Sequence, residues 1–301
     1  LSALENPVNR VTLIERQARL GRKLLTTGNG RCNLTNQNAS PAHYHGGDRD
    51  FCRYALETFP VEGTLAWFAE MGLETVTEPD GRVYPRSNMA NSVLDVLRCA
   101  LTAQPRLTLR AGTPAVGVKQ KGGSFAVTLE SGETMTAQAL ILAAGGAAGS
   151  KVGGVMDGYR LGKSLGHHRT ALYPALVQLR TDPAYPRALK GVKAQAVITL
   201  ERQGLALARE EGEILFTEYG VSGPAIFQLS RHAATGGEGL TLALDLWPER
   251  TEEEIHAWLA RRCDMERAEA MSCEQVFVGA LHNRLGQMLV KYAGVDRTAD
   301  C

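Results

Sequence analysis

The chain has 301 residues and a formal net charge of +1, with 44% hydrophobic and 22% charged residues. This length allows a large core and about two domains, and the composition is typical of a globular protein. The sequence has no block of like charges and no apolar run of about 18 residues, so we expect neither a nucleic acid nor a membrane as partner. The six cysteines are scattered without metal-binding spacing, which favours free thiols in a reducing cytoplasm and predicts no metal site.

The first predicted element is a short apolar strand, Val11 to Ile14, which ends on the acid Glu15. In a dinucleotide-binding fold, an acid at the end of the second strand accepts hydrogen bonds from ribose hydroxyls. A basic, glycine-punctuated loop follows, where glycine lets the backbone approach a pyrophosphate closely. The pattern predicts a nucleotide cofactor. Its candidate binding residues in this loop are Arg22, Lys23, Gly28, Asn29, Gly30, Arg31, Cys32 and Asn33.

The glycine fingerprint G-x-G-x-x-G, which normally precedes such an acid by about 20 residues, is absent from this sequence. Residues 1–4 have the character of the tail of a helix already under way. We therefore expect that the first strand and the phosphate loop of the fold lie outside the given sequence.

Helices are predicted next, over residues 51–59 and 61–71, the second ending at Gly72. The turn at residues 79–81 places the following segment, 81–87, on a loop between strands. Ser87 or Asn88 then caps a helix that runs to about residue 103.

Strand signals follow at residues 107–109, 113–118, 124–130 and 134–138. This meander stands where a plain nucleotide-binding unit has a crossover helix. FAD-binding relatives of the Rossmann fold commonly have a small antiparallel meander there, so the pattern favours FAD over NAD. By analogy with other flavoproteins, Val116 is a candidate for backbone contact with adenine. Residues 139–143 are predicted as a buried parallel strand. It ends in small residues that allow a ligand to approach the backbone near the adenosine or pyrophosphate, namely Ala144, Gly145 and Gly146.

After a helix predicted from Asp157 to Leu165, the pattern changes near residue 170 to short strands separated by Pro and Gly. Strands are expected at residues 176–179, 192–200, 204–209, 213–216 and 240–246, as in a small β-barrel. Helices are expected from Ser222, as N-cap, to Arg231, after a capping box at Thr251, and over residues 274–292. The predicted domains are residues 1–170, 171–249 and 250–301. A hydrolase reading of residues 220–224 fails, because Pro224 stands where the nucleophile elbow requires glycine.

Five blocks resemble the signature of a bacterial flavoprotein family, members of which have been called aminoacetone oxidases and bile-acid (3-dehydro) reductases. The blocks are GRKLLTTGNGRCNLTN (21–36), GRVYPRS (81–87), LAAGG (142–146), GHHRTALYPALVQL (166–179) and EILFTEYGVSGPAI (213–226). The resemblance implies an α/β fold: a Rossmann-like FAD-binding domain with a β-meander crossover, an inserted β-barrel and a helical segment. Family members extend beyond this sequence at both ends, and His is frequent in them where this chain has Glu218.

The resemblance implies an FAD-dependent oxidoreductase acting on a small organic substrate, by oxidising an amino-ketone-like compound or reducing an activated C=C bond, with NADH or NADPH as a possible electron donor. Because flavin supplies the electron chemistry, the catalytic residues are not predicted, and neither is the oligomeric state. Arg31 could stabilise reduced flavin or form a structural salt bridge, whereas Cys32 is expected to pack beside the cofactor. The alternatives are a flavin-binding module without turnover and a truncated chain that holds no FAD. A nicotinamide-only dehydrogenase is disfavoured by the meander and the 28–33 loop.

Overall fold

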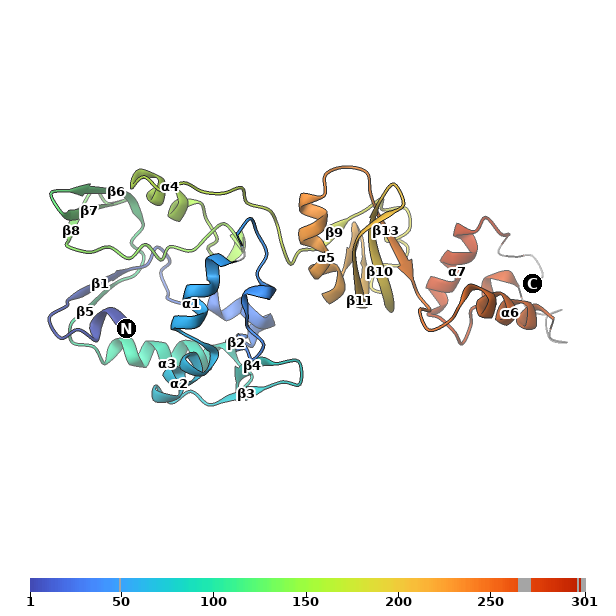
Figure 1. Cartoon of the computed structure of the whole chain (residues 1–301), viewed down its shortest axis with the longest axis horizontal. Helices are drawn as coiled ribbons and strands as arrows, with labels where there is room; N and C mark the ends of the chain where they lie inside the picture. Colours follow the sequence, from blue (N-terminus) through green and yellow to red (C-terminus); the bar gives the residue numbers. More distant parts are fainter. Residues whose placement is uncertain (49, 265–271, 297, 299–301) are drawn as a thin grey trace. The chain divides into compact units, whose positions relative to one another are not determined.

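The computed structural model of the chain describes residues 1–48, 50–264, 272–296 and 298. The chain divides into two compact units, Leu1–Thr170 and Ala171–Cys301, which are described separately below (Figure 1). The first unit contains both helices and strands, including a parallel pair, and the second combines an antiparallel sheet with helices. The α/β class predicted from the sequence is confirmed.

A two-stranded parallel sheet opens the first unit. Strand β1 (Val11–Ile14) pairs with β5 (Leu107–Arg110), with Val11 opposite Leu107 and Ile14 opposite Arg110. The ladder extends one residue further, where the Glu15 N–H donates to the Arg110 carbonyl at 2.9 Å. Parallel strands need a long crossover between them, and the segment between β1 and β5 supplies it. The end of β1 is therefore fixed at the carboxyl edge of a parallel pair.

Helices and a small antiparallel sheet fill this crossover (Figure 1). The sheet has the strand order β2-β4-β3. Its strands are β2 (Thr35–Asn36), β3 (Thr75–Thr77) and β4 (Arg82–Pro85), and its helices are α1 (Arg53–Thr58), α2 (Val61–Glu70) and α3 (Ala90–Thr102). Short 3₁₀ segments cover Ser2–Leu4, Leu24–Gly30, Pro41–His43 and Asp50–Cys52.

The sequence prediction for residues 81–87 was wrong, because most of this segment is strand β4. The strand pairs on both sides and buries Val83 and Tyr84 almost completely. The predicted cap of α3 was also wrong. Asn88 has a left-handed backbone (φ 58°) and Met89 is extended, so the helix begins only at Ala90.

A core lies beneath the 28–33 loop and holds it against α3. Cys32, Leu73, Ala90 and Val93 are buried there. Partly buried Leu24, Leu25, Leu34, Phe68, Val96 and Leu97 pack around them. The loop thus rests on packed apolar side chains.

The predicted meander is present as a three-stranded antiparallel sheet, β6-β7-β8. Its strands are β6 (Ala115–Lys121), β7 (Ser124–Leu129) and β8 (Thr134–Ala137), and α4 (Asp157–Ser164) follows a 3₁₀ segment at Ser150–Val152. Leu161 of α4 is buried with Val118, Val127 and Leu129 of the sheet.

The buried parallel strand predicted at residues 139–143 is not formed. This segment is irregular, and Ile141 and Leu142 are 77% and 39% exposed. A strand is defined by a hydrogen-bonded neighbour, and in the described part of the chain β1 pairs only with β5.

The second unit is built on an antiparallel sheet of order β13-β10-β11-β12-β9 (Figure 1). Its strands are β9 (Leu179–Arg180), β10 (Lys193–Arg202), β11 (Leu205–Thr217), β12 (Gly220–Ser222) and β13 (Leu240–Asp245). The sheet stands where the sequence predicted the barrel, and no pairing joins its two edge strands, β9 and β13, among the described residues.

Helix α5 (Pro224–Thr235) packs on this sheet, and together they form the largest core. Ile198, Ile214, Ile226 and Leu229 are completely buried in it. Two predicted strands, 204–209 and 213–216, are in fact one continuous strand, β11. Ser222 was predicted as N-cap of α5, but it lies in β12 and Gly223 takes the cap position.

The remaining helices are α6 (Glu252–Cys263) and α7 (Asn283–Tyr292), with a 3₁₀ segment at Cys273–Gln275. The capping box at Thr251 is confirmed: its side chain accepts from the Glu254 N–H at 3.3 Å, and Glu254 accepts from the Thr251 N–H at 2.9 Å. The single helix predicted over residues 274–292 was wrong, because α7 starts only at Asn283. None of the helices in the described part is long and apolar enough to cross a membrane.

Candidate functional site

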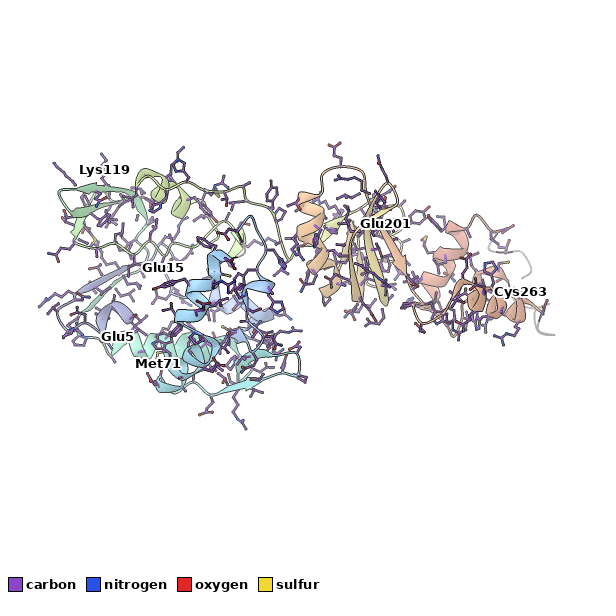
Figure 2. The ribbon with its side chains drawn as sticks, in the orientation of Figure 1. Glu5, Glu15, Met71, Lys119, Glu201 and Cys263 are labelled. Carbon is purple, nitrogen blue, oxygen red and sulfur yellow. The ribbon has the colours of Figure 1, made fainter. Side chains whose placement is uncertain are left out.

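Glu15, labelled in Figure 2, follows β1 directly. Hydrogen bonds of its backbone and of one carboxylate oxygen hold it in place. Its carbonyl accepts from the Thr113 N–H at 2.9 Å, and Oε1 accepts from the Gln17 N–H at 2.7 Å. Oε2 has no hydrogen-bond partner among the residues that the structure describes. A half-buried carboxylate with one oxygen fixed and one available can accept a hydrogen bond from a ligand hydroxyl.

The basic segment after Glu15 contacts the segment before α4. Arg22 donates to the Lys151 carbonyl and to Gln17 Oε1, both at 3.2 Å. Arg16 forms an ion pair with Asp157 at 3.1 Å. These contacts join two segments that are about 130 residues apart in the sequence.

Lys23 differs from Arg22 in its surroundings. A Cβ added to Gly149 would lie 3.8 Å from Lys23 Cε, so the lysine stem runs beside this glycine. In the described part of the chain, the Lys23 ammonium forms no ion pair. It is therefore a cation at the site that is available to an anionic ligand.

The small residues Ala144, Gly145 and Gly146 lie against the start of α4. A Cβ on Gly158 would come within 2.8 Å of the Gly145 carbonyl oxygen, so this close approach requires glycine. Gly145 has φ 69° and open space where a side chain would stand. Because Asp157 also pairs with Arg16, the structure brings the predicted 144–146 segment to the Glu15 side of the site.

Val116 is 37% exposed in β6, three residues after Thr113, whose N–H is bound to the Glu15 carbonyl. The first strand of the meander thus begins beside the end of β1. The adenine contact of Val116 stays a prediction.

The 28–33 loop has an unusual backbone. Gly28, Asn29 and Gly30 are all left-handed, with φ of 55°, 58° and 84°. A Cβ on Gly28 would lie 2.5 Å from the Asn33 nitrogen, so only glycine fits there. The Cys32 N–H closes the loop by donating to the Thr27 carbonyl at 2.9 Å.

Three side chains of this loop, Arg31, Cys32 and Asn33, contact other parts of the first unit. Arg31 Nη2 lies 2.5 Å from Glu78 Oε1, Arg31 Nε donates to Asn88 Oδ1, and the guanidinium carbon is 3.7 Å from the Tyr84 ring centroid. Cys32 is 5% exposed in the apolar cluster, which is the setting of a packing residue. The Asn33 amide, oriented by its partners, donates to the carbonyls of Val83 (3.2 Å) and Thr35 (2.9 Å).

The structure therefore sorts the predicted residues into two groups within the first unit. Arg22 and Lys23 lie against residues 149–151, downstream of the 144–146 segment, and Glu15 lies at the end of β1. The 28–33 loop is instead anchored on β4 and the start of α3. An open cavity of about 200 Å³ borders this loop. It is lined by Leu25, Gly30, Met89, Ala90 and Asn91.

Sequence reasoning missed the partners of the loop, Glu78, Tyr84 and Asn88, and the Arg16 partner Asp157. Tyr84 lay within one of the resembling blocks and Asn88 was predicted only as a helix cap, whereas Glu78 carried no signal. In the second unit, Glu218 pairs with Lys190 at 3.0 Å. No group of His, Cys, Asp and Glu within the described ranges could hold a metal ion. Cys32, Cys99 and Cys263 are free thiols, and Cys301 lies outside the described residues.

Comparison with known proteins gives a matching family model and several similar proteins. A family model described as the HI0933-like protein Rossmann domain matches residues 2–277. A 3-dehydro-bile acid delta(4,6)-reductase of Clostridium scindens is 32% identical over 95% of this chain and 69% of its own length.

Two ribosomal RNA dihydrouridine synthases are similar at lower identity. The Escherichia coli protein is 28% identical over 75% of this chain and 56% of its own length. The Haemophilus influenzae protein is 26% identical over 82% of this chain and 61% of its own length. The chain thus spans about six tenths of these two relatives.

Proposed function

The chain belongs to the HI0933-like Rossmann-domain family, a family of oxidoreductases, and on this premise we propose that it is an FAD-dependent reductase of an activated C=C bond in a small organic molecule. The observation that carries the proposal is the available Glu15 oxygen at the end of a parallel strand, together with an available Lys23 in the basic segment that follows this strand. This arrangement fits a dinucleotide, whose ribose hydroxyls donate and whose pyrophosphate is anionic.

The residues of the first unit fit FAD in a definite order. Glu15 would accept from the ribose, Val116 would lie by the adenine, and Lys23 with Arg22 would face the pyrophosphate. The 144–146 segment would let the cofactor approach the backbone, since Gly145 leaves open space there. The 28–33 loop would run along the rest of the cofactor.

When bound, FAD would supply the hydride chemistry between a nicotinamide donor, NADH or NADPH, and the substrate. The chain's own residues would bind and orient the cofactor. The left-handed backbone of the 28–33 loop would hold that loop in a single conformation. The names of the relatives favour reduction over amine oxidation. Both the reductase and the dihydrouridine synthases, by name, saturate a C=C bond, and in both substrates that bond is conjugated to a carbonyl group.

A second candidate function follows from the same names, namely reduction of a uridine base in RNA. The greater identity and coverage of the bile-acid reductase favour the small-molecule substrate. The neutral charge balance of the chain agrees with this preference, since RNA binding commonly relies on a basic surface.

Anaerobic spectroscopy tests the proposal. The purified chain is incubated with FAD and desalted, and the visible flavin bands are followed on addition of NADH or NADPH and then of acceptors. We expect bleaching by a nicotinamide and recovery of the bands on addition of a steroid dienone. Recovery only with uridine-containing RNA would support the second candidate. Bound flavin that no donor reduces would indicate a binding module, and absence of flavin after desalting would refute the cofactor assignment.

A further inference from the structure

Backbone strain in the first unit is concentrated around the 28–33 loop. The described non-glycine residues with positive φ are Asn29, Cys32, Asn88, Leu176 and Gln203. Three of these five, Asn29, Cys32 and Asn88, lie within two residues of Arg31 or bind it. Left-handed backbone at non-glycine residues persists only where the surrounding structure enforces it. The contacts that enforce it here are those of the Arg31 side chain and the core below Cys32.

Arg31 connects three separate elements. It binds Glu78, which follows β3, it lies over Tyr84 of β4, and it donates to Asn88, which precedes α3. Both partners of the ion pair are about one third exposed, at 32% and 33%. The Arg31 charge is therefore balanced by a carboxylate on the protein, and its planar fork is already engaged on two acceptors.

We propose that Arg31 is a positioning residue that fixes the 28–33 loop, and that Glu78, Tyr84 and Asn88 act with it. Arg31 follows Gly30, and Asn88 precedes Met89, so the bond between Arg31 and Asn88 joins the two walls of the loop cavity. Loss of the bridge lets the loop and the start of α3 separate. The expected effect on FAD binding rests on the proposed function, whereas the expected effect on the loop conformation does not.

The alternative is that Arg31 acts directly on the flavin by its charge. Removing the Arg31 cation would then lower the flavin midpoint potential, and removing the Glu78 anion would raise it. A positioning role predicts a different pattern. Loss of either residue weakens FAD binding in the same direction, and the potential of the flavin that remains bound is unchanged.

The test uses Glu78→Gln, an isosteric change that removes the carboxylate charge, together with Arg31→Lys and the double variant. Glu133→Gln is the matched control, because Glu133 pairs with Arg110 through two bonds of 2.6 and 2.7 Å in the same unit, outside the loop. Hydrogen exchange of the amides of residues 27–33 is measured on the flavin-free chain. The FAD dissociation constant and midpoint potential are measured after loading.

We expect exchange in residues 27–33 to rise at least about tenfold in Glu78→Gln and in Arg31→Lys. Hydrogen exchange in the double variant should be no faster than in the more affected single variant, because both changes break the same network. The control should leave exchange unchanged. Unchanged exchange in both single variants, additive effects in the double variant, or potentials that shift in opposite directions would each overturn the inference.

A loosened loop in a chain that never binds FAD, with or without the substitutions, would leave the positioning role standing and refute the proposed function. Normal FAD binding in all variants, with a loosened loop, would confirm the positioning of the loop and overturn its role in holding the cofactor.

Discussion

Replacement of Glu15 by Gln isolates the contact of this residue with a ligand. The Gln17 N–H needs an acceptor at Oε1, and the carbonyl of a glutamine can still provide it. The other oxygen becomes an NH₂ group, which cannot accept from a ribose hydroxyl. A hydrogen bond to a charged group contributes about 1.5–3 kcal/mol. At 1.4 kcal/mol per factor of ten, Glu15→Gln should weaken FAD binding about 10-fold to 100-fold.

The assay for Glu15→Gln is a titration of FAD followed by quenching of flavin fluorescence, with the thermal midpoint of the flavin-free chain as the control. Glu15→Ala should weaken binding as much and also lower the midpoint, because the Gln17 N–H loses its acceptor. If FAD affinity is unchanged in both variants, Glu15 does not contact the ribose, and the placement of the cofactor at the end of β1 is wrong.

Three further substitutions are expected to have separable effects. Ile226→Ala should destabilise the second unit by about 2–5 kcal/mol, as measured by urea unfolding, because it empties a completely buried site; FAD affinity should not change. Gly28→Ala should weaken FAD binding, because its Cβ would meet the Asn33 nitrogen at 2.5 Å in a left-handed backbone; normal affinity would show that the loop does not hold the cofactor. Burial, reinforced by Arg231, holds the pKa of His232 below its ordinary 6.5, so protonation favours unfolding. The stability that neutral His232 provides is present above about pH 6.5 and falls as the pH is lowered through the folded pKa, and His232→Asn should flatten this dependence in thermal unfolding between pH 7 and 5.

Elements with a local signal were predictable from the sequence. Strand β1, the meander β6-β7-β8 and helix α2 form close to the expected residues, because each carries its own periodicity and ends at a turn or a glycine. The capping box at Thr251 is defined by two residues three positions apart, and it forms as predicted. In these cases the information that selects the structure lies within a few residues.

Elements that depend on distant partners were not predictable. Strand β4 has a turn-like start at Gly81, but pairing with β2 and β3 converts the segment into a buried strand. Conversely, residues 139–143 are apolar enough for a buried strand but lack a hydrogen-bonded neighbour in the described part of the chain. The helical pattern of residues 274–292 extends over a segment that folds as turns before α7. Tertiary pairing overrides local propensity in all three cases.

The candidate site shows the same division between local and distant information. The predictions for Glu15 and the glycines of the 28–33 loop rest on local features, namely an acid directly after a strand and glycines within a basic segment. The role of Arg31 could not, because it depends on Glu78 and Asn88, which lie 47 and 57 residues away. A basic residue in a glycine-rich loop has the same appearance in the sequence whether its charge faces a ligand or a carboxylate of the protein.

The cations of the site are therefore expected to have different roles. An ion pair with atoms 2.5 Å apart has little net field at the distance of a ligand, because the two charges nearly cancel. Arg22 donates to neutral groups, the Lys151 carbonyl and the Gln17 amide, so its charge is not cancelled, and neither is that of Lys23. If FAD binds as proposed, attraction of the anionic cofactor would come from Arg22 and Lys23. In the proposed arrangement Arg31 would fix the shape of the loop, and it would contribute to affinity through the geometry of the backbone.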